Sequence, residues 1–264
     1  MIKILTGQSH VLFTSRCNES IKVAMKVVAG LGRHIVLYQE EGGWLTYEKY
    51  ITQAGLEPIK MVTDDGLIFE KELNQYDYDI SLLLNSMPGY VANHDMESVF
   101  AHCAKNDIFL VNDVSGSIGS NMAKIGDIIV GSFNKAKPVD LGRGGFIATN
   151  NKELFSAIEE LLDEEPDMDY QTLSEKLKNL EKRREFLLER AKQIKQDLIT
   201  HKIVHPNQNG FNVIVRFEDD KEKEDIIYYC NQNNLEYTEC PREIRILDNA
   251  ISIEVKRLTG HGDK

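Results

Sequence analysis

Short apolar runs alternate with amphipathic segments along the first 150 residues of the chain. Runs of mainly apolar residues bounded by polar positions predict strands. They lie at residues 11–13, 34–38, 58–62, 80–84, 108–111, 128–130 and 146–148. Between them, apolar residues at helical spacing predict helices at residues 21–28, 45–54 and 96–104. Strands and helices that alternate in this way indicate an α/β fold with three layers, a mostly parallel sheet covered by helices on both faces.

The pattern changes after Asn150. A helix is predicted at residues 152–162, the acidic segment 163–167 breaks it, and a long second helix extends to Leu198. Alternating or apolar runs then predict strands at 211–217, 243–247 and 251–255, with a helix at 221–233. We therefore divide the chain into a large domain, residues 1–150, and residues 151–264, which hold the connecting helices and a small C-terminal α/β domain.

Composition and charge exclude several classes of function. The 264 residues carry a formal charge of −11, which argues against broad contact with nucleic acid or an acidic membrane surface. The chain has no apolar run long enough to span a bilayer, and its first residues turn polar too early for a signal peptide. The four Cys and seven His show no metal-binding spacing, so we expect no metal site. These features together predict a cytoplasmic protein.

The candidate chemistry lies around a lysine-containing loop, Gly131-Ser132-Phe133-Asn134-Lys135-Ala136-Lys137-Pro138. Earlier in the chain, Asp113 ends the apolar strand predicted at residues 108–111. A lysine amine forms a Schiff base with pyridoxal phosphate, and an aspartate can pair with the protonated pyridine nitrogen of that cofactor. Lys137 and Asp113 are therefore the candidate catalytic residues, with pyridoxal 5'-phosphate as the candidate cofactor.

From residue 11 to about residue 150 the chain resembles fold-type I pyridoxal phosphate enzymes, and within them the DegT/DnrJ/EryC1/StrS aminotransferases. In that family the Schiff-base lysine follows the pattern S-F-x-x-x-K and precedes a Gly-Gly turn. Ser132, Phe133 and Lys137 fit the pattern, with Gly144-Gly145 following. Lys135 is the competing lysine and lies two residues early.

The resemblance implies a role for two further features of the large domain. It implies that Asp113 binds the pyridine nitrogen, although an aspartate before Ser115 is also typical of a turn or helix cap. It implies that Trp44, the only tryptophan, stacks on the cofactor ring, with core packing as the alternative.

The phosphate group is expected at the start of the first predicted helix, where backbone N–H groups are available. The family's phosphate turn aligns with residues 15–18, so Ser15, Arg16, Cys17 and Asn18 are candidate ligands, and Ser132 is another. Arg16 replaces the usual glycine of this turn. A capped helix start with a solvated arginine is the alternative interpretation.

Two departures from the family pattern stand out. Members usually carry Gln or His three residues after the aspartate, where it supports the ring oxygen of the cofactor. This position is Gly116, and Ser115 or Ser117 is the candidate replacement. The chain is also shorter than members usually are, so we expect no N-terminal arm over the active site.

The resemblance also implies the substrates and the assembly. Arg242 and Arg245 are candidates for binding a substrate carboxylate, although solvated strand arginines explain them equally well. Asn85 follows a predicted strand and is a further candidate near the substrate. The implied function is transfer of an amino group from an amino acid donor to a small keto acceptor, by analogy a nucleotide-linked sugar. Lys137 would act as a general base with a lowered pKa, in a homodimer. Another pyridoxal phosphate reaction, such as a lyase or desulfurase, and a non-catalytic binding protein remain as alternatives.

Overall fold

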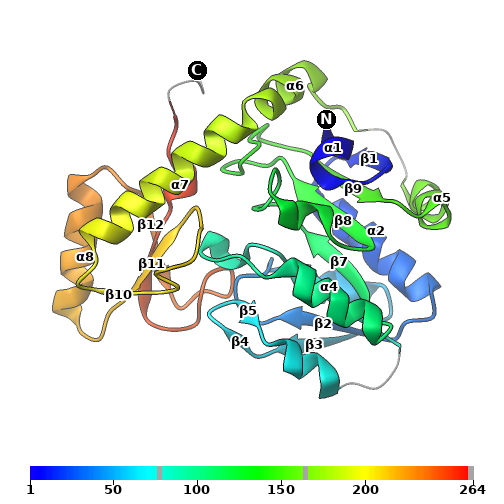
Figure 1. Ribbon diagram of the computed structural model, residues 1–264, viewed down its shortest axis with the longest axis horizontal. Coiled ribbons are helices and arrows are strands. Elements are labelled where there is room, and N and C mark those ends of the chain that lie inside the picture. Colours follow the sequence, from blue (N-terminus) through cyan, green and yellow to red (C-terminus); the bar gives the residue numbers. More distant parts are fainter. Residues whose placement is uncertain (76–78, 163–165, 261–264) are drawn as a thin grey trace.

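The computed structural model describes residues 1–75, 79–162 and 166–260, and a seven-stranded sheet forms its larger part (Figure 1). Neighbouring strands pair in parallel from β3 to β8, while β9 pairs antiparallel with both β8 and β1. In spatial order the strands are β1 (His10–Thr14), β9 (Gly145–Thr149), β8 (Ile128–Ser132), β7 (Phe109–Asp113), β6 (Ile80–Asn85), β2 (Ile35–Gln39) and β3 (Glu57–Met61). The predicted mostly parallel sheet is confirmed.

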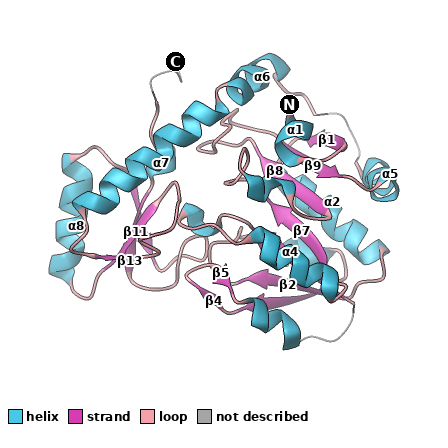
Figure 2. Ribbon diagram, viewed as in Figure 1, coloured by secondary structure: helices cyan, strands magenta, loops and turns pink. Residues whose placement is uncertain are grey.

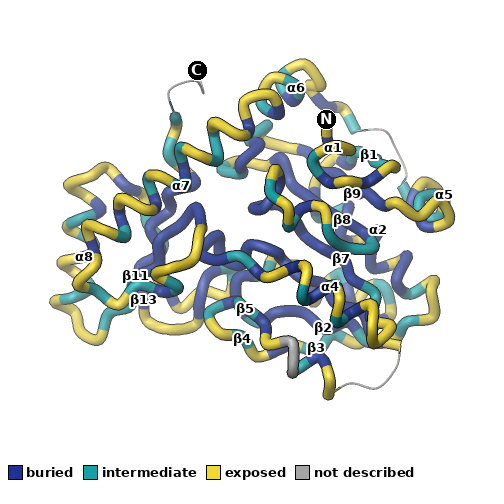
Figure 3. Tube along the Cα trace, in the orientation of Figure 1, coloured by how far each residue is buried: buried dark blue, intermediate teal, exposed yellow. Residues whose placement is uncertain are grey.

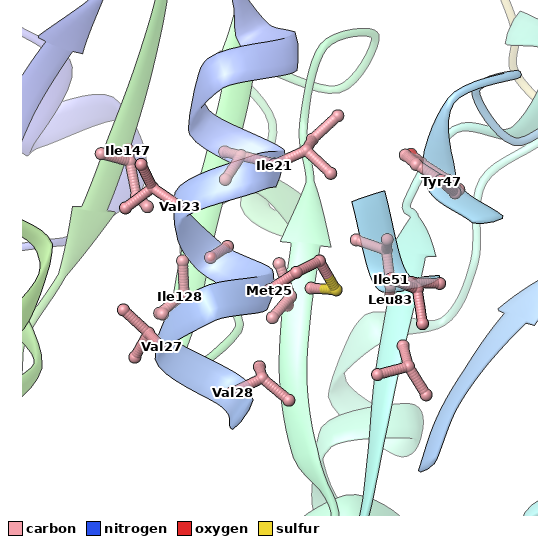
Figure 4. Close-up of a cluster of buried hydrophobic side chains, with 14 of the residues drawn as sticks. Ile21, Val23, Met25, Val27, Val28, Tyr47, Ile51, Leu83, Ile128 and Ile147 are labelled. Carbon is pink, nitrogen blue, oxygen red and sulfur yellow. The ribbon is translucent and has the colours of Figure 1, made fainter. Parts of the chain in front are cut away.

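Helices cover both faces of this sheet. On one face, α2 (Cys17–Gly30) and α3 (Tyr47–Gln53) bury their apolar sides against the strands (Figure 4). Helix α5 (Lys152–Leu161) packs on the same face. On the other, α4 (Met96–Lys105) packs near the centre and α1 (Ile2–Thr6) near the β1 end. In β7, Val111 faces the α2 side and Leu110 the α4 side, as expected for the twofold alternation of a strand. The central strand β6 is fully buried and mainly apolar, because both of its faces are covered by helices.

A second, four-stranded sheet lies in the C-terminal part of the chain (Figure 2). All of its pairings are antiparallel. Its order is β10 (Lys202–Ile203), β11 (Val213–Arg216), β13 (Ala250–Ile253) and β12 (Tyr237–Cys240). Helices α7 (Leu180–Asp197) and α8 (Asp220–Gln232) pack on one face of it, around Phe211 and Val213. The central strands β11 and β13 are buried, whereas the outer sides of both helices are exposed (Figure 3).

Two predictions for the C-terminal part are wrong. The long second helix is two helices, α6 (Tyr170–Lys178) and α7, because Asn179 ends the first and begins the second. Residues 243–247 form a turn rather than a strand, closed by a hydrogen bond from Arg242 N to Ile246 O at 2.8 Å. The helix predicted at 152–162 is α5, and residues 163–165 of the predicted break lie outside the described residues.

Smaller elements complete the chain. A two-stranded ribbon follows β3, and the described residues also form four short 3₁₀ helices. The ribbon is β4 (Thr63–Asp64) with β5 (Leu67–Ile68), and the 3₁₀ helices are η1 (Glu70–Gln75), η2 (Pro88–Tyr90), η3 (Asn121–Lys124) and η4 (Val255–Arg257). Among the described helices, none combines the length and apolar character needed to cross a membrane.

Candidate active site

A cavity of about 190 Å³ opens at the carboxyl edge of the parallel strands. Loops that follow β2, β6, β7 and β8 bring their side chains to this edge, and the turn after β12 and helix η4 close the cavity from the small sheet. A wider cleft of about 950 Å³ adjoins it and shares Lys137, Arg245 and Lys256 with it. Crevices outside the carboxyl ends of parallel strands are the usual ligand sites of such sheets.

Asp113 lies at the end of β7, in the wall of the cavity, and is 3% exposed. Its Oδ2 accepts a hydrogen bond from the Tyr47 hydroxyl at 2.7 Å, and its Oδ1 accepts one from the Ser115 backbone N–H at 2.9 Å. Burial, and next the charge of Asp113, raise the pKa of Tyr47 well above its ordinary value, so the phenol remains a donor. The carboxylate is therefore held in one orientation. Tyr47 was not identified from the sequence.

Lys137 reaches the same cavity from the loop between β8 and β9. Its Nζ donates a hydrogen bond to the Tyr90 hydroxyl and lies 5.6 Å from the centre of the Trp44 ring. Burial lowers the pKa of Lys137, but the interactions with Tyr90, Asp113 and Cys17 outweigh it, and the net pKa is raised. The lowered pKa expected of this lysine belongs to its role as general base with the cofactor bound, and it stays a prediction.

Lys135, the competing lysine, is exposed and lines only the wider cleft. Its backbone N–H donates to Asn134 Oδ1 at 2.9 Å, which fixes the turn. The two lysines therefore differ in environment, and only Lys137 lies on the cavity that contains Asp113.

Trp44 lies at the mouth of the cavity and is 39% exposed. Its Nε1–H donates to Asn18 Oδ1 at 2.7 Å, which fixes the indole at the first turn of α2. An indole held at one wall by its polar edge presents a flat surface to a planar ligand. Asn18 acts here as a partner of Trp44 and also lines the cavity.

Helix α2 points its N-terminus into the cavity. Among the described residues, no side chain caps it at Arg16, so its first backbone N–H groups remain available to an anion. Arg16 and Cys17 line the cavity, and burial raises the pKa of the Cys17 thiol well above its ordinary value. Ser15 faces away, since its backbone N–H and its hydroxyl both donate to Glu19 Oε2, at 2.9 and 2.8 Å.

The remaining polar candidates also border the cavity. Ser132 ends β8 and accepts a hydrogen bond from Asn134 N–H at 3.2 Å, and Ser115 lies 3.8 Å from the Cys17 sulfur. Asn85 donates to Gly42 O at 2.9 Å and so holds the loop that precedes Trp44. Ser132, Ser115 and Asn85 are each less than a tenth exposed.

The two candidate arginines occupy different environments. Arg245 is buried, and its Nε and Nη2 donate to the two carboxylate oxygens of Glu254 at 2.8 Å each, while Nη1 donates to Ile244 O. Burial raises the pKa of Glu254, but Arg245, Lys256 and Arg257 outweigh it and bring it to about 2. The guanidinium of Arg245 is thus already paired. Arg242 is exposed and lies outside the cavity.

The residues that the sequence did not single out include Tyr90 and Lys256. Tyr90 belongs to η2, after Pro88-Gly89, and has a positive φ of 65°. The Nζ atoms of Lys137 and Lys256 lie 4.9 and 4.4 Å from the centre of its ring. A Pro-Gly pair indicates a turn but not which side chain it directs inward. The sequence therefore held no signal for either residue.

These surroundings fit pyridoxal phosphate. The uncapped start of α2 suits a phosphate group, the indole of Trp44 suits an aromatic ring, and Asp113 and Lys137 lie on the same cavity. Among the described residues, no cluster of three His, Cys, Asp or Glu side chains could hold a metal ion. The donor set is thus that of an anionic aromatic ligand.

The arrangement of the large sheet, its helices and the small sheet is that of the fold-type I pyridoxal phosphate-dependent transferases. The chain belongs to the DegT/DnrJ/EryC1/StrS aminotransferase family, whose family model matches residues 2–177. A second model, the MJ1341 family C-terminal domain, matches residues 174–261.

Several solved structures share the fold of this chain. A DegT/DnrJ/EryC1/StrS aminotransferase from Brucella abortus superposes with a TM-score of 0.75 at 14% identity, covering 99% of this chain and 85% of that one. PseC from Helicobacter pylori, an aminotransferase involved in the biosynthesis of pseudoaminic acid, has a TM-score of 0.75 at 14% identity, covering 96% and 83%. NtdA from Bacillus subtilis, with bound cofactor PMP, has a TM-score of 0.70 at 15% identity, covering 96% and 70%.

Proposed function

We propose that this protein is a pyridoxal phosphate-dependent aminotransferase in which Lys137 and Asp113 are the catalytic residues. The observation that supports this proposal is that both side chains lie on one cavity, together with the uncapped N-terminus of α2. Family membership supports the same reaction class. The similar structures, at 13–16% identity, support only the fold.

When bound, pyridoxal phosphate supplies an aldehyde that combines with amines. It also supplies a pyridine ring that accepts electrons from the α-carbon of the substrate when that carbon loses a proton. The carboxylate of Asp113, fixed by Tyr47 and the Ser115 N–H, would pair with the ring nitrogen and keep it protonated. Trp44 would cover one face of the ring. The N–H groups at the start of α2, with Arg16 and Ser132, would bind the phosphate.

Lys137 would hold the cofactor and later move the proton of the substrate α-carbon at its Nζ. The Tyr90 hydroxyl accepts a hydrogen bond from this nitrogen and so fixes where it lies. Since the surroundings raise the pKa of Lys137, its ammonium form is favoured before the cofactor arrives. The amine must lose that proton before it can react with the aldehyde.

The substrates in this proposal are an amino acid donor and a small keto acceptor. The family relation to aminotransferases supports amine and keto substrates in general. A nucleotide-linked sugar acceptor is part of the proposal by analogy with the DegT/DnrJ/EryC1/StrS aminotransferase family. The proposal also includes a cytoplasmic homodimer, with residues 1–150 as the cofactor domain and residues 151–264 as the connecting helices and small domain.

The test is an absorbance scan of the purified protein with added pyridoxal phosphate, before and after borohydride reduction. We expect a visible band that reduction removes, with the reduced cofactor on the peptide that contains Lys137. Lys137→Ala should abolish this labelling, whereas the matched variant Lys135→Ala should keep it. Labelling that survives Lys137→Ala and is lost in Lys135→Ala would move the assignment to Lys135.

The reaction class needs a second measurement on the loaded protein. A panel of amino acids is incubated with it, and the products are analysed by mass spectrometry. Keto acids with the cofactor left in its amine form indicate transamination. Release of sulfur or of a cleaved side chain indicates a desulfurase or lyase, and bound cofactor without any product indicates a binding protein.

A further inference from the structure

Lys256 is a buried lysine in the wall of the cavity that the proposed chemistry does not use. It belongs to η4, directly after the last strand of the small sheet, and is 8% exposed. It borders both the cavity of Lys137 and the wider cleft beyond it. Buried lysines are rare unless an oppositely charged partner lies nearby, so the groups that surround the Lys256 amine are informative.

The partners of Lys256 in the protein are weak. Its Nζ lies 4.4 Å from the centre of the Tyr90 ring and 3.8 Å from Glu254 Oε2. Within residues 1–75, 79–162 and 166–260, this nitrogen makes no hydrogen bond. An ammonium has three donors, so its capacity for hydrogen bonding is unused in the direction of the cavity.

The carboxylate nearest to Lys256, that of Glu254, is hydrogen-bonded to Arg245. Both oxygens of Glu254 accept from Arg245 at 2.8 Å, so Lys256 is left with the longer contact. Arg257 also lies 3.8 Å from Glu254 but has its own partner, Glu236, at 2.9 Å. On the small-sheet side of the cavity, the two buried cations Arg245 and Lys256 thus share one buried anion.

The electrostatic balance of this region favours an added anion. Burial, and then the charges of Arg245 and Lys137, lower the pKa of Lys256 well below its ordinary value. A ligand with a negative group beside Nζ would offset both effects, because opposite charges nearby favour the ammonium form. It would also supply the missing hydrogen-bond acceptor.

We propose that Lys256 binds the carboxylate of the substrate, at the end of the cavity formed by the small sheet. This inference rests on the proposed function, because the substrate would be joined to a cofactor held by Lys137. Arg245 then acts as a positioning residue that occupies Glu254 and leaves Lys256 free for the substrate. The carboxylate belongs to the amino acid donor or to an acidic acceptor, and both present the same chemistry to the amine.

The test uses two reagents that differ only in the proposed group. Aminooxyacetate and O-methylhydroxylamine both react with lysine-bound pyridoxal phosphate, and loss of visible absorbance follows the reaction, but only the first carries a carboxylate. In Lys256→Met, we expect the second-order rate constant for aminooxyacetate to fall about 10- to 100-fold, the range of a charged hydrogen bond. The rate constant for O-methylhydroxylamine should change less than about 2-fold.

Matched variants separate the site from general effects. Lys135→Met removes a cation from the wider cleft and should leave both rate constants unchanged, and Lys256→Arg should recover part of the preference for aminooxyacetate. Equal losses with both reagents in Lys256→Met, or no loss with either, would overturn the inference. Repeating the donor and acceptor half-reactions separately with carboxylate and amide substrates then assigns the carboxylate to one of them.

A cofactor-free measurement keeps the inference testable if the proposed function fails. Absence of a cofactor band in the wild-type protein contradicts the proposed function. Succinate is then titrated into the cofactor-free protein and followed by the fluorescence of Trp44, the only tryptophan, which borders the cavity. A dissociation constant at least about 10-fold higher in Lys256→Met supports the anion site, and an unchanged constant or no binding to wild type overturns it.

Discussion

A Cβ atom added to Gly116 would lie 2.9 Å from Cε1 of Tyr90 and 3.1 Å from Cδ1. The ring of Tyr90 therefore occupies the space that a side chain at residue 116 would need. Its hydroxyl extends from there to Lys137. The glycine where family members carry Gln or His is thus accompanied by a tyrosine from another loop that enters the same cavity.

The first prediction concerns this pair. Gly116→Ala should destabilise the protein by about 1–3 kcal/mol, because the added methyl group overpacks a buried contact with a rigid ring. In a Tyr90→Ala background, the same change should cost at least about 1 kcal/mol less, since the opposing ring is gone and only the Met87 Cβ, 3.2 Å from the added atom, remains close. Urea unfolding of the four proteins in this double-mutant cycle measures the coupling. Equal costs in both backgrounds would show that Tyr90 does not restrict residue 116.

A second prediction concerns the proton on Lys137. Burial alone lowers the pKa of this lysine, and Tyr90 is the largest of the interactions that raise it. Tyr90→Phe should therefore lower the pKa of Lys137 and increase its neutral fraction at a given alkaline pH. Competitive labelling with acetic anhydride across the pH range, read by mass spectrometry, should show the Lys137 midpoint moved to lower pH. The profile of Lys135, outside the cavity, is the internal reference, and a Lys137 profile identical in both proteins contradicts the prediction.

The large sheet could be predicted from the sequence because its strands are buried on both faces. A continuous apolar run such as the one in β6 reports burial directly, whatever the partner strands are. The same logic failed at residues 243–247, where Ile244, Arg245 and Ile246 alternate as in a half-buried strand. In the structure Arg245 is buried next to the buried Ile246, which breaks the alternation, and Glu254 pairs with the buried guanidinium.

The candidate site could be predicted only where its residues lie in a local motif. Lys137 and Ser132 share one loop, and Asp113 ends a strand, so spacing and strand position were enough to select them. Tyr90 and Lys256 come from two different 3₁₀ helices, η2 and η4, and their approach to Lys137 depends on how distant segments pack. The sequence around Tyr90 or Lys256 contains no pattern from which their closeness to Lys137 could be predicted.

A third prediction tests the charge cluster at Glu254. Glu254→Gln should destabilise the protein at pH 7 by about 3–5 kcal/mol, because it leaves the buried Arg245 and Lys256 without their anion. The matched control is Glu236→Gln, which removes the exposed partner of Arg257 and should cost less than about 1 kcal/mol. Urea unfolding compares the two. If both variants lost a similar free energy of unfolding, the prediction would be wrong, because the buried carboxylate of Glu254 would contribute no more to stability than the exposed one of Glu236.

The carboxyl group of Glu254 also predicts how the stability of the wild-type protein changes at low pH. Its pKa is about 2 in the folded protein against an ordinary value of 4.5, so its contribution is full above pH 4.5 and is lost as the pH falls toward 2. Glu254→Gln should lack this part of the pH dependence. A variant that loses stability below pH 4.5 as steeply as wild type would contradict the assignment.

The last prediction concerns His94, which lies between η2 and α4 and is 5% exposed. Burial, and next the charge of His205, lower its pKa from 6.5 to about 3, and among the described residues its Nε2 has no hydrogen-bond partner. Below pH 6.5 His94 is therefore protonated in the unfolded chain but stays neutral in the folded protein. This difference lowers the free energy of unfolding progressively as the pH falls from 6.5 toward 3. At pH 5 the loss should be about 2 kcal/mol relative to pH 7.5, from about 1.4 kcal/mol per pH unit.

His94→Leu, which replaces an unpaired polar ring by an apolar side chain, should lose about 2 kcal/mol less than wild type over the same interval. Urea unfolding at both pH values measures this difference, and parallel losses in the two proteins would show that His94 is protonated in the folded state.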